Sequence, residues 1–139
     1  VDTAILFSQA AIERLCWSYC VERAKTLTKD QFKSGGMTAA SRLRHLFRDL
    51  SLPVEIPQTT RNVLPQHLAG LDGMQLITQI RNKLVHPSTA APLAPDTFYE
   101  VWKLSMWYIE CAILRIAGYT GNYANRVSQG WVGQVESMP

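Results

Sequence analysis

Residues 96–118 read DTFYEVWKLSMWYIECAILRIAG, and this stretch decides the fold because a helical pattern runs along its whole length. Asp96 is suited to cap the helix, and Gly118 is suited to end it in the position after the C-cap. Two apolar stripes follow the predicted helix. The first holds Phe98, Val101, Trp102, Ser105, Tyr108, Ile109, Ala112 and Ile116, and the second holds Leu104, Trp107, Cys111 and Leu114. A helix with two such stripes is central in its own domain or shared with a second chain.

Upstream of this stretch, the same periodicity predicts further helices and no strands. They are expected over about Thr3–Lys25, from a Thr38 cap to about Leu50, near Pro65–Leu71, and from an Asp72 cap to His86. Residues 29–36 contain breakers, and residues 87–95 form a Pro- and Ala-rich loop. We therefore predict one all-α domain over residues 1–139, an up-down bundle of four to five helices with an irregular C-terminal tail over residues 119–139.

The composition is that of a globular domain, with 47% hydrophobic and 18% charged residues in 139. The net charge of +3 and the pI near 8.9 permit a nucleic-acid partner without requiring one. No apolar run approaches the roughly 18 residues of a membrane span, and the start of the chain lacks the basic region of a signal peptide. Because the chain begins at Val1, we expect it to be a piece of a longer protein.

Three cysteines, Cys16, Cys20 and Cys111, all lie inside apolar helical patterns. Their odd number argues against a disulfide framework and for a reducing, cytoplasmic compartment. A structural zinc site needs four ligands, and no CxxC or HxxxH pair completes one around Cys16 and Cys20. We interpret these two cysteines as buried small apolar residues, and we expect no metal and no cofactor.

The predicted helix that ends at His86 carries an arginine on its apolar side. With successive residues about 100° apart, Arg81 falls within the arc of Met74, Leu76, Ile77, Ile80, Leu84 and Val85. Unpaired burial of a guanidinium costs several kcal/mol, so Arg81 is expected to have a specific partner. One interpretation is a buried ion pair with Glu13, Glu22, Glu100 or Glu110.

A histidine stands five residues after that arginine. On a continuous helix Arg81 and His86 would diverge by about 140°, but the helix must stop before Pro87, so His86 could turn back toward Arg81. Asn82 is four residues before His86 and could hold one imidazole nitrogen. The alternative is that His86 is only a helix C-terminal histidine favoured by the helix dipole.

Arg81-Asn82-Lys83-Leu84-Val85-His86 resembles the defining motif of HEPN domains, in which an arginine and a polar residue precede a histidine at this spacing. Residues 114–126, LRIAGYTGNYANR, look like the end of the Apea-like branch of that family. The resemblance covers nearly the whole chain and is most specific over residues 81–86 and 114–126. It implies a helical bundle with the motif at the end of a late helix.

The resemblance also implies a function. HEPN ribonucleases are homodimers whose two motifs face each other across the interface, and they cleave RNA without a metal. The ribose 2′-OH attacks the adjacent phosphorus, which leaves a 2′,3′-cyclic phosphate. Arg81, Asn82 and His86 are then the expected catalytic residues, and a toxin or defence effector is the expected role. The alternatives are a non-catalytic HEPN-like module that binds RNA or dimerises, and a plain helical oligomerisation domain.

A second basic group lies on the helix that begins at Thr38. Arg42, Arg44 and Arg48, with His45, could bind RNA phosphates. The alternative is an ordinary solvated helix face. His67 is expected to cap or to pack, and the sequence shows no Ser-His-Asp order, Gly-rich phosphate loop or paired carboxylates.

Overall fold

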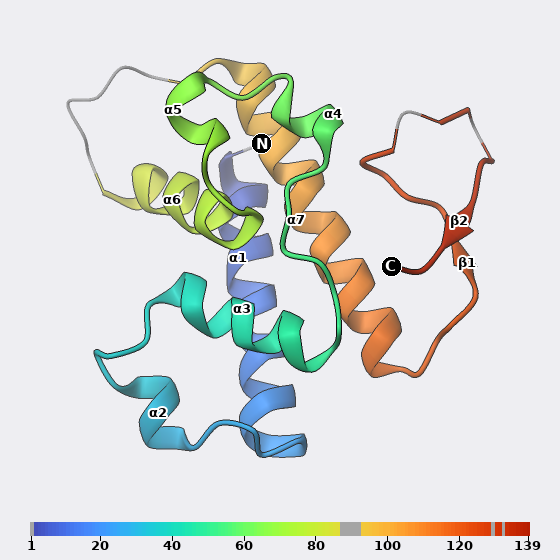
Figure 1. Cartoon of the computed structure of the whole chain (residues 1–139). Helices are drawn as coiled ribbons and strands as arrows, with labels where there is room; N and C mark the ends of the chain where they lie inside the picture. The colour runs from blue at the N-terminus through green and yellow to red at the C-terminus, as the bar shows by residue number, and fades with distance from the viewer. Residues whose placement is uncertain (1, 87–92, 129, 132) are drawn as a thin grey trace.

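The computed structural model describes residues 2–86, 93–128, 130–131 and 133–139 (Figure 1). In chain order the elements are α1 (Asp2–Cys16), η1 (Trp17–Arg23), α2 (Lys29–Lys33), α3 (Ala39–Asp49), α4 (Gln58–Arg61), α5 (Gln66–Ala69), α6 (Gly73–Val85), α7 (Pro95–Ile116), β1 (Asn122–Tyr123) and β2 (Glu136–Ser137). The predicted all-α helical bundle is confirmed. The predicted loop over residues 87–95 lies mostly outside the described residues, and its last residue, Pro95, begins α7.

The four longest helical segments form the body of the molecule. α1 packs along α7 and also against α3 and α6, while α6 contacts both α3 and α7. In Figure 1, α3 and α6 lie across α1, and the chain after α7 extends beside the C-terminal part of that helix. This arrangement leaves the C-terminal end of α6 at the edge of the body.

The predicted first helix is confirmed in extent, but its second part is not an α-helix. Trp17–Arg23 is a π-helix, in which the Ala24 N–H donates to the Tyr19 oxygen at 2.7 Å. The segment ends at Arg23, and Lys25 just beyond it has a left-handed φ of 56°. π-Helical turns inside α-helices are rare and frequent at functional sites. Here the wider turn places Cys20 in the packed interface with α3.

Local capping signals account for most of the helix ends. Thr38 and Asp72 accept hydrogen bonds from the N–H groups of Ser41 and Gln75, as predicted. Gly118 has a φ of 76°, and its N–H and that of the next residue bond back to the last turn of α7 in a Schellman motif. The prediction that Asp96 caps α7 is wrong. Ala94 is the N-cap, because the proline at position 95 has no N–H and fits the first helical position.

Three elements were not predicted, namely α2, α4 and the strand pair β1–β2. The segment expected to be broken contains α2, which Thr28 and Gln31 begin with a reciprocal capping box. The described part of residues 119–139 contains the antiparallel pair β1–β2, where the sequence indicated no strand. Each strand has two residues, too few for an alternating pattern to be visible.

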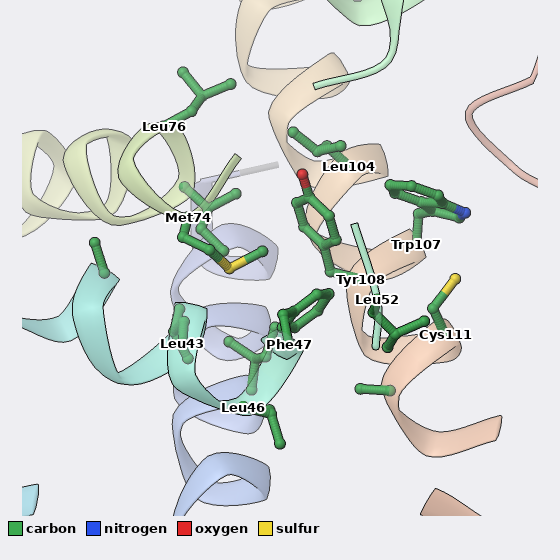
Figure 2. Packing of buried hydrophobic residues seen from close by; sticks show 14 of the residues in the cluster. Leu43, Leu46, Phe47, Leu52, Met74, Leu76, Leu104, Trp107, Tyr108 and Cys111 are labelled. Carbon is green, nitrogen blue, oxygen red and sulfur yellow. The ribbon is translucent and has the colours of Figure 1, made fainter. Parts of the chain in front are cut away.

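One cluster of apolar side chains connects the helices (Figure 2). Phe47 of α3 meets Tyr108 of α7 edge to face at 5.1 Å, and Trp107 beside it donates from Nε1 to the Tyr123 hydroxyl at 2.7 Å. All members of the two predicted stripes of α7 are buried or half-buried within the chain. α7 is therefore central in its own domain, and its two stripes give no reason to expect a partner chain.

Candidate functional site

The motif of Arg81, Asn82 and His86 occupies the last turn of α6, where the helix leaves the core. Earlier in the helix Met74 and Ile80 are fully buried, whereas Arg81 is half-buried and Asn82 and His86 are exposed. His86 is the C-cap, with φ −109° and ψ 117°. The following proline explains this extended backbone and confirms the predicted end of the helix.

A groove of about 520 Å³ runs along the polar face of α6. Its described lining consists of Ala40, Leu71, Gln75, Thr78, Gln79, Asn82, Lys83 and His86. Asn82 and His86 therefore share one groove, and Arg81 is not among these lining residues. Thr78 Oγ1 is buried there, without a hydrogen-bond partner in the described part of the chain. The groove offers amide and hydroxyl groups with one imidazole at its end.

Arg81 does not form an ion pair with any of the four glutamates that the sequence offered as partners. In the described residues they have other partners: Gln9 for Glu13, Trp17 for Glu22, Lys103 for Glu100, and Arg126 for Glu110. Nη1 of Arg81 instead donates to Asn82 Oδ1 at 3.2 Å. The interpretation of Arg81 as the partner of one of these glutamates is wrong within the chain. The reason is that the apolar arc of α6 continues past the core, so that Arg81 reaches solvent.

Asn82 and His86 are joined through the backbone. The His86 N–H donates to the Asn82 carbonyl at 2.9 Å, which keeps His86 in the last helical turn. The predicted bond from the Asn82 amide to the imidazole is not found among the hydrogen bonds of the described residues. The Asn82 oxygen accepts from Arg81 instead, so the amide holds the guanidinium rather than the histidine.

The side chains of the three arginines expected to bind RNA phosphates do not point in the same direction. Arg42 turns toward α2, where it donates to the Phe32 oxygen at 2.7 Å and lies 4.9 Å from the Phe32 ring. Arg44 and Arg48 line a separate cavity of about 600 Å³. Nε of Arg44 is 2.5 Å from Asp72 Oδ2, so its charge is partly compensated. Phosphate binding by these residues stays a prediction.

A cluster of polar side chains was missed by the sequence reasoning. Cys20 of η1 approaches His45 and Asp49 of α3, and Thr26 donates to the same Asp49 carboxylate. Hydrogen bonding with Cys16 lowers the pKa of Cys20, against the effect of its burial. The same bond and burial raise the pKa of Cys16. Only the i,i+4 spacing of His45 and Asp49 was visible in the sequence, because Cys20 is far from both along the chain.

Cys16 and Cys20 are buried, as predicted, and both are free thiols. Among the described residues, no helix is both long and apolar enough to cross a membrane.

Residues 1–137 match the family model described as the YopA C-terminal domain. The chain belongs to that family. It is similar to the SPbeta prophage-derived uncharacterized protein YopA of Bacillus subtilis (strain 168), with 33% identity over 129 residues. The matched region is 91% of this chain and 28% of that relative, so the chain spans under a third of its length. No solved structure matches the chain significantly. Membership of this family does not assign a reaction to the chain. The resemblance to HEPN domains stays a prediction.

Proposed function

We propose that this chain is a metal-independent endoribonuclease domain of the HEPN type that acts as a homodimer in the reducing cytoplasm. The observation that carries the proposal is the placement of Arg81, Asn82 and His86 at the protruding end of α6. The guanidinium, amide and imidazole are not buried in the core. The Arg81 guanidinium donates to the Asn82 amide, and Asn82 and His86 line one groove.

The chemistry of these groups suits cleavage by the ribose 2′-OH. An imidazole exchanges a proton near neutral pH. A guanidinium offers fixed, two-pronged positive charge to a pentavalent phosphorane. In this proposal His86 moves a proton at the 2′-oxygen or the 5′-oxygen, Arg81 binds the non-bridging oxygens, and Asn82 orients Arg81. The products are a 2′,3′-cyclic phosphate and a 5′-OH.

One imidazole does not readily serve as base and acid in the same step, and a second copy would supply the other. Val85 supports a contact at this place, because it lies within the motif on the apolar arc of α6 and is 43% exposed. Two copies that meet through their α6 ends would cover this residue and bring two Arg81–His86 sets together. A relative encoded in a prophage fits a role as a toxin or defence effector.

The test is cleavage of mixed RNA by the purified chain in EDTA, with detection of cyclic-phosphate ends. His86→Ala and Arg81→Ala are each expected to lower cleavage by about a hundredfold or more. Arg81→Lys should also fail, because an ammonium does not reproduce a planar fork. DNA of the same sequence should resist, since it lacks the 2′-OH.

The matched controls are His67→Ala on α5 and Arg14→Ala on α1, two exposed positions outside the groove. Both should retain full cleavage. The melting temperature of His86→Ala should stay unchanged, because the side chain is exposed. A dimer that leaves RNA intact would favour a non-catalytic module, whereas a folded and fully active His86→Ala variant would remove His86 from the mechanism.

A further inference from the structure

Three side chains of metal-binding type meet where the π-helical segment η1 packs on the C-terminal half of α3. The ligand atoms of Cys20, His45 and Asp49 all lie within 4.8 Å of one another. Cys20 Sγ is 4.0 Å from Asp49 Oδ2, and His45 Nε2 is 3.3 Å from the same oxygen. Cys20 is fully buried and the other two are half-buried, so the group is shielded on one side and open on the other.

The two separations from Asp49 Oδ2 are close to those around a tetrahedral zinc ion. With Zn–S near 2.3 Å and Zn–N or Zn–O near 2.0–2.1 Å, neighbouring ligand atoms are about 3.3–3.6 Å apart. The nitrogen–oxygen distance already fits, and the sulfur–oxygen distance must shorten by roughly half an ångström. Small rotations of side chains on two packed helical segments are sufficient for such a change.

The donor set selects among metals. A thiolate, an imidazole and a carboxylate together suit Zn²⁺, whereas Ca²⁺ and Mg²⁺ prefer oxygen ligands alone. With the thiol proton released to solvent, the thiolate and the carboxylate balance the two charges of the ion. Cys16 is not part of this group of mutually close ligand atoms, and its Sγ donates to the Arg42 oxygen at 3.2 Å.

The surroundings of the cluster resemble an outer shell. The Thr26 hydroxyl donates to Asp49 Oδ2 and lies 3.1 Å from His45 Nε2. It can therefore orient the carboxylate or hold a water molecule in the fourth position. On the other side of the imidazole, Arg48 Nη2 is 2.6 Å from Nδ1. An imidazole bound to a metal through Nε2 carries its proton on Nδ1, so the exposed Arg48 must then turn away to solvent.

We propose that Cys20, His45 and Asp49 bind one Zn²⁺ ion, with the fourth position open to water. The ion joins η1 to α3 and stabilises the packing of the long N-terminal helix. The site is separate from the α6 groove. Ala40 at the start of α3 lines that groove, whereas His45 and Asp49 lie in the second half of α3 and do not line it. Zinc here has no part in the proposed RNA cleavage.

The experiment is titration of metal-stripped protein with Zn²⁺ in competition with a chromophoric chelator, followed by substitution with Co²⁺. We expect one equivalent of bound metal, a thiolate-to-cobalt charge-transfer band in the near ultraviolet, and a higher melting temperature with zinc. Cys20→Ser, His45→Ala and Asp49→Asn should each weaken binding by at least about tenfold. Cys20→Ser should also abolish the charge-transfer band.

Matched controls use the same residue types elsewhere in the chain. Cys111→Ala, His67→Ala and Asp30→Asn should bind zinc as the parent protein does. Arg48→Ala should bind equally well or more tightly, because it removes a positive charge and a competing bond to Nδ1. Circular dichroism of each variant identifies loss of binding that arises from unfolding. Failure to bind one equivalent, or a charge-transfer band that survives in folded Cys20→Ser, overturns the proposal.

Discussion

Gly73, the first residue of α6, lies closer to Tyr108 than any side chain would permit. A Cβ at this position would be 1.8 Å from the Tyr108 hydroxyl oxygen, 2.5 Å from Cζ and 2.7 Å from Cε2. The tyrosine is held in place, since its hydroxyl donates at 3.1 Å to both the Val54 and the Glu55 carbonyls. The Gly73 N–H donates to the same Val54 carbonyl at 2.8 Å. We therefore expect Gly73→Ala to push α6 away from α7.

The size of the effect follows from the geometry. An ordinary contact needs roughly 3.4 Å, so the two helices or the ring must move by more than an ångström in a close-packed core. Overpacking of this kind costs about 1–3 kcal/mol. The loss of backbone freedom in the unfolded alanine variant offsets about 0.4–1 kcal/mol. We expect a net loss of about 1–2 kcal/mol, which lowers Tm by roughly 3–7 °C in a chain of this length.

Urea denaturation at equilibrium measures the change, with Gly70→Ala as the control. At Gly70 no heavy atom lies within 4 Å of the added carbon, and φ is −83°. That variant should be as stable as the parent or slightly more stable. A Gly73→Ala protein with the stability of the Gly70→Ala protein would refute the reasoning. Adding Tyr108→Phe should rescue Gly73→Ala only partly, since Cζ remains in the way.

Other features of the structure predict distinct outcomes. Asp72→Ala should lower the free energy of unfolding by about 1–2 kcal/mol through loss of the N-cap of α6, while Asp96→Ala should change little; equal effects in urea would contradict the capping assignment. Ser51→Gly should stabilise the protein by up to about 1 kcal/mol in thermal unfolding, because Ser51 follows the C-cap of α3 and has a φ of 54°. Burial raises the pKa of Cys111 to about 11. Iodoacetamide at pH 8 should therefore modify Cys111 slowly in the native protein and rapidly in urea, as mass spectrometry would show.

The sequence by itself determined the helical class and several helix ends. Thr38, Asp72 and Gly118 act on backbone groups within a few residues of themselves, so their effects are readable without knowledge of distant contacts. The end of α6 at His86 follows in the same way from the proline that comes next. The group of Arg81, Asn82 and His86 was visible because the three residues are close together along the chain.

What each helix faces was decided only by the tertiary structure. Two apolar stripes on α7 are compatible with a partner chain or with a central place, and the packing of α1, α6 and the C-terminal segment selected the second. Likewise, the apolar arc of α6 did not reveal that its last turn extends past the core and leaves Arg81 half-buried. Periodicity gives the direction in which a side chain points around the axis of its helix. Whether that side chain is buried depends on where the other helices end.

The cluster of Cys20, His45 and Asp49 shows the same division most clearly. Nothing in the local sequence links a cysteine in the first helix with a histidine and an aspartate in α3. Cys20 lies in the π-helical segment η1, and the packing of η1 against α3 brings the three side chains together. Such a turn replaces i→i+4 bonds by i→i+5 bonds, a change that propensities do not encode. Side chains far apart in a sequence become neighbours only when the burial of apolar surface brings their helices together.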